Sequence, residues 1–397
     1  MKLAARAKNI SPSPTLSIDA QAKKMIAAGE NVINFGAGEP DFDTPEHIKQ
    51  AAVEALQKGM TRYTPVGGTP ALKEAIVKKF KEDNGLDYPP EQIVVSCGAK
   101  HSLYNAIQVL CEPGDEIILP APYWVSYLEQ IKLAGGRPVI VQTRAENGFK
   151  LTVEELETVV SPRTRMIILN SPGNPTGAVY TREELAALGE VLLKRGITII
   201  SDEIYEKLIY DGLEHVSIAS LDPGLKELTV VINGVSKAYA MTGWRIGYAA
   251  APAPAARAMA DLQSHSTSNP TSIAQAASVA ALTGTQEPLK AMVAEFNRRR
   301  DYMLERLLAI PGVSCFRPGG AFYLFPSIER LIGRAYKGKT ISSASDLAAI
   351  LLAEARVAVV PGVAFGDDRC FRLSYATSLE NIKEGLDRIG EVLTAVR

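Results

Sequence analysis

Histidine and cysteine are both scarce in this chain. Its 397 residues include four histidines and four cysteines. No histidines pair at metal-ligand spacing and there is no C-x-x-C motif, so the sequence predicts no metal centre. The widely spaced cysteines (Cys97, Cys111, Cys315 and Cys370) are typical of the reduced, mostly buried thiols of a cytoplasmic protein.

Long apolar runs and a strong net charge are also absent. No uninterrupted apolar segment is long enough to span a bilayer, and charges interrupt residues 1–8, which therefore lack the apolar core of a signal peptide. The formal net charge is −1, so no overall field favours nucleic acid or an acidic membrane surface. The sequence therefore predicts a cytoplasmic, globular protein with neither membrane nor nucleic-acid partners.

What the chain does contain is a regular alternation of apolar runs with helical stretches. Seven strand-like runs are Ile93–Ser96, Glu116–Leu119, Pro138–Val141, Met166–Leu169, Thr198–Ile200, Leu228–Ile232 and Gly247–Ala250. This alternation predicts an α/β fold with a mostly parallel, seven-stranded sheet flanked by helices. A dinucleotide-binding version of the fold is disfavoured, because no G-x-G-x-x-G motif follows the first strand.

The rest of the chain predicts a smaller α+β domain. A long charged helix begins near Glu287 and passes through Arg298-Arg299-Arg300, which we expect on a solvated face. Four short strands are expected afterwards, at Val313–Phe316, Ala321–Phe325, Val357–Val360 and Cys370–Tyr375. We divide the chain into an N-terminal arm that forms part of the small domain (1–44), a large domain (45–285) and the C-terminal small domain (286–397). Thr44 is the expected N-cap of a helix that starts at Pro45.

Small and basic residues recur where predicted strands of the large domain end. Gly98, Ala99 and Lys100 end the first strand and open a helix, whose free N–H groups can bind an anion, although an ordinary tight turn explains them equally well. Lys237 lies just beyond the sixth strand, where ligands bind in open α/β sheets. A desolvated lysine there can form a Schiff base with a carbonyl, whereas a lone lysine is more often a surface residue.

Other strand ends carry groups suited to a planar, cationic ring. Asp202 follows the fifth strand, where a carboxylate can hold a ring nitrogen protonated or can cap a helix. Tyr205 lies one helical turn further on. Trp124 can stack on a ring or pack against neighbours, and the Asn174 amide lies in a turn-rich loop after the fourth strand. Far away in the chain, Arg372 can bind a carboxylate bidentately or be an edge-strand charge.

Taken together, these segments resemble the class I pyridoxal-phosphate-dependent aminotransferases of fold type I. Within that family the chain is most similar to the bacterial branch of aspartate aminotransferases. The resemblance covers nearly the whole chain and rests on Gly36–Phe42, Pro122–Tyr127, Asn170–Gly177, Ser201–Tyr205, Val235–Gly247 and Arg372–Thr377.

The resemblance implies pyridoxal 5′-phosphate as the cofactor and gives residues to it. Lys237 would form a Schiff base with it and shuttle the proton, and Asp202 would pair with the pyridine nitrogen. Asn174 and Tyr205 would bond the phenolic oxygen, and Trp124 would stack on the ring. The phosphate would be held by Gly98, Ala99, Lys100, Ser236 and Arg245, together with Tyr63 of the partner subunit. The active form would therefore be a homodimer with shared active sites.

The resemblance also implies how the substrate binds. Arg372 would clamp the α-carboxylate, with the Gly38 backbone and Asn174 beside it. Residues 264–268 hold no arginine for a distal carboxylate, so Lys100 and Thr15 would bind that group. We expect transfer of the amino group of L-aspartate to 2-oxoglutarate with ping-pong kinetics and room for a broader range of amino acids. An aromatic, prephenate or kynurenine aminotransferase and a C–S lyase are the alternatives. A non-catalytic regulator is not expected, since no DNA-binding segment precedes the arm.

Overall fold

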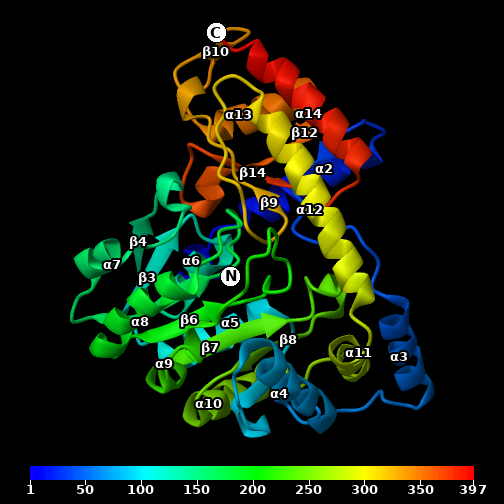
Figure 1. Ribbon diagram of the computed structural model, residues 1–397, viewed down its shortest axis with the longest axis vertical. Coiled ribbons are helices and arrows are strands. Elements are labelled where there is room, and N and C mark those ends of the chain that lie inside the picture. The colour runs from blue at the N-terminus through cyan, green and yellow to red at the C-terminus, as the bar shows by residue number, and fades with distance from the viewer.

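The computed structural model describes all 397 residues, which form two lobes connected by a long helix (Figure 1). The larger lobe is built on a central sheet, and the smaller lobe combines short strands with α13 (Ala344–Ile350) and α14 (Leu379–Thr394). Helix α12 (Glu287–Leu308), yellow in the figure, runs from the larger lobe to the smaller one. None of the helices combines the length and apolar character that a membrane crossing requires.

The central sheet contains all seven predicted strands. They are β2 (Ile93–Ser96), β3 (Glu116–Ala121), β4 (Arg137–Gln142), β5 (Thr164–Asn170), β6 (Thr198–Asp202), β7 (Thr229–Gly234) and β8 (Gly247–Ala250). Their order across the sheet is β2-β8-β7-β6-β5-β3-β4. Only β8 runs against its neighbours β2 and β7, so the predicted α/β fold with a mostly parallel sheet is confirmed.

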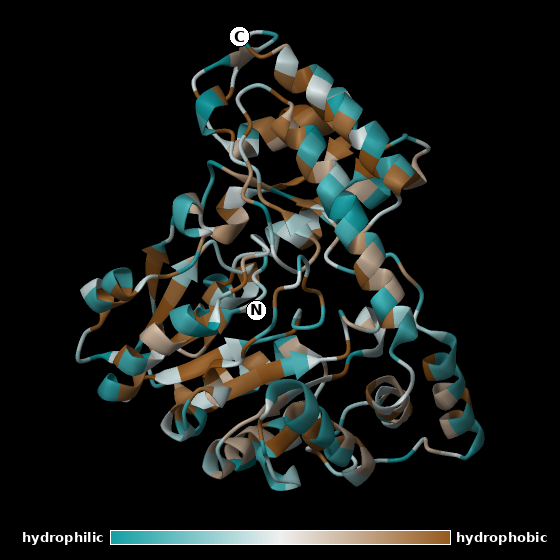
Figure 2. Ribbon diagram, in the orientation of Figure 1, coloured by the Kyte–Doolittle hydropathy of each residue, from teal (hydrophilic) through white to brown (hydrophobic).

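Alternate residues of the central strands pack against different layers of helices. In β5, Met166 and Ile168 join the apolar cluster under α5 (Ala99–Leu110) and α10 (Ala253–Ser264). Ile167 and Leu169 join the cluster under α8 (Arg182–Arg195) on the opposite face. Both faces are therefore buried, which is why these strands are continuous apolar runs instead of alternating ones. Figure 2 shows the brown strands enclosed by helices that are partly teal.

The chain has eight further α-helices, one of which (α2) packs against short strands of the smaller lobe. The eight are α1 (Ala5–Lys8), α2 (Pro14–Ala27), α3 (Glu46–Gln57), α4 (Pro70–Asn84), α6 (Val125–Leu133), α7 (Val153–Val159), α9 (Pro223–Leu228) and α11 (Ser272–Thr283). The predicted N-cap of α3 is wrong: Pro45 occupies that position without a side-chain cap. The Thr44 hydroxyl instead donates to the Ala240 carbonyl at 2.7 Å and accepts from Trp244 Nε1 at 2.9 Å. The Thr44 hydroxyl therefore bonds residues that are distant in the sequence and does not cap the helix that follows it.

The smaller lobe contains three short β-structures. Strands β13 (Val360–Pro361), β14 (Phe371–Ser374) and β9 (Tyr323–Leu324) form one antiparallel sheet. Strand β1 (Ile33–Asn34) pairs with β12 (Val357–Ala358), and β10 (Ala335–Tyr336) pairs with β11 (Lys339–Thr340). The predicted strand at Val313–Phe316 is wrong, because only Ser314 makes an isolated bridge there, to Ser327. The N-terminal segment joins this lobe through β1, while the domain boundaries at 44 and 285 stay predictions.

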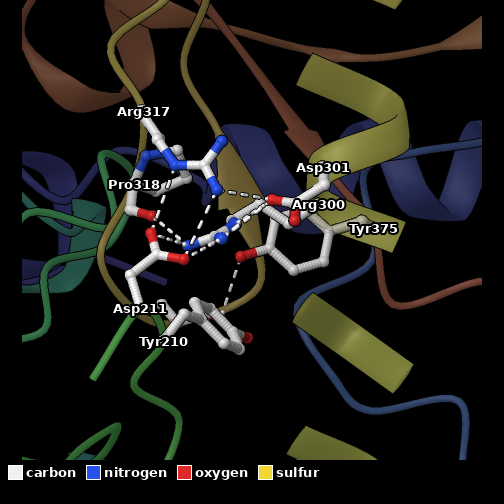
Figure 3. Close-up of polar contacts among 8 residues, drawn as sticks. Tyr210, Asp211, Arg300, Asp301, Arg317, Pro318 and Tyr375 are labelled. Carbon is white, nitrogen blue, oxygen red and sulfur yellow. Dashed lines mark hydrogen bonds and ion pairs between the residues drawn. The ribbon is translucent and has the colours of Figure 1, made fainter. Parts of the chain in front are cut away.

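In the arginine run of α12, Arg298 is exposed, as predicted for a solvated face, whereas Arg299 and Arg300 are buried. Arg300 is fully buried and its guanidinium binds both carboxylate oxygens of Asp211 at 2.7 and 2.9 Å (Figure 3). It also donates to the Pro318 carbonyl and to Asp301. Arg299 is buried as well and binds Asp41 at 2.8 Å. The sequence prediction is wrong for Arg299 and Arg300 because α12 crosses between two lobes and this part of it is covered.

Candidate active site

A pocket of about 410 Å³ lies where the carboxyl ends of the parallel strands meet the smaller lobe. Its walls include Asp202 at the end of β6, Lys237 beyond β7, Arg372 of β14 and residues of α2. The side chains come from segments separated by hundreds of residues. Of all the site residues predicted from the sequence, only Gly98 and Tyr63 are outside its lining.

Lys237 is held in the pocket by one hydrogen bond. Its Nζ donates to the Gly38 carbonyl at 2.6 Å, and it lies 5.8 Å from the centre of the Tyr205 ring. Burial, together with the charges of Arg372 and Arg245, lowers the pKa of the Lys237 amine to about 8, and the carboxylates of Glu39 and Asp202 oppose this. Near neutral pH the neutral fraction of this amine is therefore much larger than that of an ordinary lysine, and a nucleophile or base must be neutral.

Asp202 is buried at the bottom of the pocket. Tyr127 Oη donates to its Oδ2 at 2.7 Å, and the Ile204 amide donates to Oδ1 at 3.2 Å. The neighbouring strand also supports it, since Asn170 Nδ2 donates to the Asp202 carbonyl at 2.9 Å. Burial raises the pKa of the Asp202 carboxyl to about 6, although both hydrogen bonds to the carboxylate oppose this. A cationic partner inside the pocket would favour its ionised form.

The N-terminus of α5 forms a cradle with the loop after β7. Gly98 is the N-cap of α5 with φ of 89°, and no side chain caps this helix end. This positive φ favours glycine, and a Cβ atom at Gly98 would also lie 2.4 Å from Arg245 Nη2, so a side chain there would displace the arginine. Arg245 is itself held by the carbonyls of Thr242 and Cys97. Free helix N–H groups beside an arginine are suited to an anion.

Arg372 forms the opposite wall of the pocket. It is 2% exposed; Nη1 donates to Asn174 Oδ1 at 3.0 Å and Nη2 donates to the Gly36 carbonyl at 2.8 Å. Its guanidinium carbon lies 4.4 Å from the centre of the Tyr323 ring, while its Nε is buried without a partner. Both partners are uncharged, so the positive charge is uncompensated and available to a carboxylate ligand.

The mouth of the pocket holds the two groups predicted for a distal carboxylate. Lys100 Nζ lies 5.0 Å from the centre of a Trp124 ring. The Thr15 hydroxyl is 2.9 Å from that of Ser13, at the start of α2. Burial and the charge of Arg245 lower the pKa of Lys100. Lys100, Trp124 and Thr15 all line the same pocket, although they come from three separate segments.

Tyr63 does not join these groups within one chain. Its side chain is 92% exposed and does not line the pocket. The single chain therefore does not bring Tyr63 to the site, whereas it brings all the other predicted residues to it or, for Gly98, directly behind it.

Sequence reasoning did not assign a role to several residues that contribute to the site. Tyr127 binds Asp202, Tyr323 contacts both Tyr205 and Arg372, and Glu39 accepts from the Thr242 hydroxyl at 2.7 Å. The only signal for Tyr127 is its place in the aromatic motif Pro122–Tyr127. Tyr323 has none, since an aromatic residue in a short strand normally indicates packing.

Comparisons with known proteins agree with this geometry. The family model described as aminotransferase class I and II matches residues 30–389. The aspartate aminotransferase of Geobacillus stearothermophilus is 54% identical over 100% of both chains. The aspartate/prephenate aminotransferase of Nitrosomonas europaea is 48% identical over 99% of this chain and 100% of its own. The crystal structure of the aspartate aminotransferase from Rhizobium meliloti has a TM-score of 0.97 at 48% identity and covers 100% of both chains.

The fold and the pocket therefore define a transferase of fold type I. More narrowly, the chain belongs to the class I and II aminotransferases, a family that uses pyridoxal phosphate. The family resemblance inferred from the sequence motifs is confirmed.

Proposed function

We propose that this chain is an aspartate aminotransferase that transfers the amino group of L-aspartate to 2-oxoglutarate with pyridoxal phosphate, by ping-pong kinetics. The observation that carries the proposal is the convergence of Lys237, Asp202 and Arg372 on one pocket. An amine of lowered pKa, a buried carboxylate and an uncompensated guanidinium are the three groups that amino-group transfer needs. The names of the relatives support aspartate as the donor.

The donor set of the pocket fits pyridoxal phosphate. The uncapped N-terminus of α5, Ser236 and Arg245 would hold the phosphate, and Gly98 leaves the space that a side chain would fill. Asp202 would bind the ring nitrogen, and its buried carboxyl is otherwise held only by neutral donors. Asn174 and Tyr205 would bind the phenolic oxygen, while Trp124 offers an aromatic face.

Pyridoxal phosphate, when bound, supplies an aldehyde that condenses with amines and a cationic ring that takes up the electron pair left at Cα. Lys237 acts as the base that accepts the Cα proton and returns it later, because its pKa of about 8 leaves a neutral fraction. Asp202 keeps a proton on the ring nitrogen through its negative charge. Asp202 is buried, so its interaction with the ring nitrogen would be stronger than the same interaction in water.

The substrate is oriented by its carboxylate. Arg372 presents its guanidinium with Asn174 and the backbone of Gly38 beside it, so the α-carboxylate has a charge-assisted partner. Lys100 and Thr15 would take the distal carboxylate. A single ammonium group lacks the bidentate fork of arginine, so we expect this end of the site to tolerate other side chains.

The test is spectroscopic and kinetic. The purified protein should be yellow because of the visible absorption band of bound pyridoxal phosphate. This band should bleach on adding aspartate and return on adding 2-oxoglutarate. Among aspartate, phenylalanine, alanine and kynurenine, aspartate should have the highest kcat/KM. A higher value for a neutral donor would contradict aspartate specificity, while a colourless protein that does not bind pyridoxal phosphate would contradict the proposal itself.

A broader aminotransferase is the second candidate. A relative of 48% identity is named aspartate/prephenate aminotransferase, and the distal subsite has one ammonium group in place of an arginine fork. Prephenate used as amino acceptor, at a kcat/KM near that of 2-oxoglutarate, would favour it. A C–S lyase would instead release pyruvate and ammonia from cystathionine without any oxo acid.

We also propose a homodimer with shared active sites. Tyr63 is 92% exposed, and Val53, Leu56 and Met60, which precede it in the chain, are exposed apolar side chains as well, which supports burial against a second copy. Sedimentation should give twice the chain mass of 42.7 kDa. Tyr63→Phe should weaken cofactor affinity about tenfold through one lost hydrogen bond. A monomer whose cofactor affinity is unchanged by Tyr63→Phe would contradict shared sites.

A further inference from the structure

Two buried tyrosines share a hydrogen bond at the floor of the pocket. The hydroxyl oxygens of Tyr205 and Tyr323 are 2.9 Å apart, and either can be the donor. Tyr205 follows β6, whereas Tyr323 is the first residue of β9 in the smaller lobe. Both side chains are almost fully buried, at 4% and 1% exposure, so water does not compete with this bond.

Tyr323 contacts the rest of the site on its other sides. Its ring lies under the Arg372 guanidinium at 4.4 Å. Its hydroxyl would be 3.5 Å from a Cβ atom at Gly38, the residue whose carbonyl accepts from Lys237. Tyr323 therefore lies between the carboxylate-binding arginine, the reactive lysine and Tyr205.

The backbone of Tyr323 is held by both lobes. Strand β9 pairs with β14, with Ser374 opposite Tyr323. Just before it, the Ala321 amide donates to the Leu208 carbonyl at 2.9 Å, and the Ala321 carbonyl accepts from Tyr210 and Tyr375. Figure 3 shows these two tyrosines beside Arg300, which donates a hydrogen bond to the carbonyl of Pro318 in the same segment. The Tyr323 hydroxyl is thus a fixed partner for a residue of the other lobe.

Counting protons decides the direction of the hydrogen bond. A tyrosine hydroxyl has one proton, so it can donate to only one acceptor at a time. In the proposed function, on which this direction rests, the proton of Tyr205 goes to the phenolic oxygen of the cofactor. Tyr323 must then be the donor within the tyrosine pair.

We propose that Tyr323 is a positioning residue that donates to Tyr205 and thereby directs the Tyr205 proton to the cofactor. A donor at the Tyr205 oxygen polarises its O–H group and strengthens the bond that this group donates. The proton that Tyr323 donates also prevents the O–H group of Tyr205 from turning toward the Tyr323 oxygen. The pair therefore stabilises negative charge on the phenolic oxygen more than Tyr205 alone does.

The loaded enzyme offers a direct readout. The visible absorption band of the bound cofactor changes with pH. Stabilising negative charge on the phenolic oxygen favours the deprotonated form, so it lowers the midpoint of this titration. Tyr323→Phe keeps the ring under Arg372 and removes only the hydroxyl. We expect it to raise the midpoint by about 0.5 pH, the size of a partial loss of one hydrogen bond.

The matched control is Tyr375→Phe. Tyr375 is also fully buried and donates to the Ala321 carbonyl, but it does not line the pocket. It should leave the midpoint unchanged, so a general loosening of the segment is separated from the loss of the Tyr323 hydroxyl. An equal shift in both variants would overturn the positioning role.

A double variant tests whether Tyr323 acts through Tyr205. In the background of Tyr205→Phe, adding Tyr323→Phe should move the midpoint no further. The same shift in both backgrounds, or no shift from Tyr323→Phe in the otherwise unaltered enzyme, would overturn the inference. Neither result would affect the proposed function, which fails only if the unaltered protein has no cofactor band that aspartate bleaches.

Discussion

Lys237→Ala is expected to lower kcat for aspartate transamination by at least about 10⁴-fold, since it removes both a nucleophile and a proton acceptor. The Lys237 amine is the one bonded to Gly38 within the pocket, and its lowered pKa suits both tasks. Single-turnover loss of the cofactor band after mixing with aspartate measures the chemical step directly. The variant should still fold, because Lys237 lines the pocket and its truncation enlarges this pocket without leaving a void in the hydrophobic core.

Lys23→Ala is the matched control for Lys237→Ala. Lys23 also lines the pocket, but its ammonium group is paired with Asp19 at 2.8 Å and its side chain is 65% exposed. We expect its kcat to stay within about threefold of the unaltered enzyme, as is usual for a weak surface ion pair. If Lys237→Ala transaminates at the unaltered rate, Lys237 is not the reactive lysine.

Asp202→Asn is expected to have opposite effects on activity and stability. The substitution keeps the shape of the side chain but removes the charge that would hold the ring nitrogen protonated. We expect kcat to fall about 10³-fold, the size found for a lost electrostatic contact in a buried site. Stopped-flow measurement of Cα-proton removal, with and without deuterium at Cα, should place this loss in the proton-transfer step.

The same substitution should stabilise the cofactor-free protein above about pH 6. Burial raises the pKa of the Asp202 carboxyl from 3.8 to about 6. The folded state therefore binds more protons than the unfolded state between these values, so stability falls as pH rises through this window. The pKa difference of about two corresponds to roughly 3 kcal/mol, or about 3 °C in unfolding temperature. Asparagine avoids this cost near neutral pH and should give no gain near pH 3.8.

Asp211→Asn provides the control of opposite sign. The hydrogen bond and charge of Arg300 hold the pKa of the Asp211 carboxyl at about 2. An acid with a lowered pKa stabilises the fold above its ordinary pKa, and this contribution is lost only as pH falls toward 2. Asp211→Asn should therefore lower the unfolding temperature at neutral pH, where Asp202→Asn raises it. A loss of stability in Asp202→Asn as well would contradict a costly buried charge at Asp202.

The sheet is predictable because its strands are buried on both faces. A strand such as β5 places Met166 and Ile167 against different helical layers, so each position must be apolar and the run is recognisable without any structure. The predicted strand at Val313–Phe316 is also a short run rich in apolar residues, yet only its polar residue, Ser314, finds a partner. Strand formation needs a neighbour, and a local pattern does not supply one.

Charged and polar side chains were harder to place. Arg299 and Arg300 occur in a charged helix, where charges usually face solvent, but Asp41 and Asp211 from other segments accompany them into the interior. Thr44 precedes a helix and has the chemistry of an N-cap, but Trp244 and Ala240 bind it instead. In each case the partner lies far away in the sequence, so the residues next to a charged or polar side chain do not show whether it will be buried.

For the site, the amino-acid sequence by itself determined which chemistry is present. Lysine, aspartate, asparagine and a glycine-opened helix follow successive strands, and parallel strands end at one edge of a sheet, so their convergence is a consequence of chain order. The tertiary structure alone decided how these groups are tuned. The burial that lowers the pKa of Lys237 and raises that of Asp202 comes from walls contributed by both lobes. The tyrosine pair joins residues 118 positions apart, and such a contact exists only after the smaller lobe has packed against the larger one.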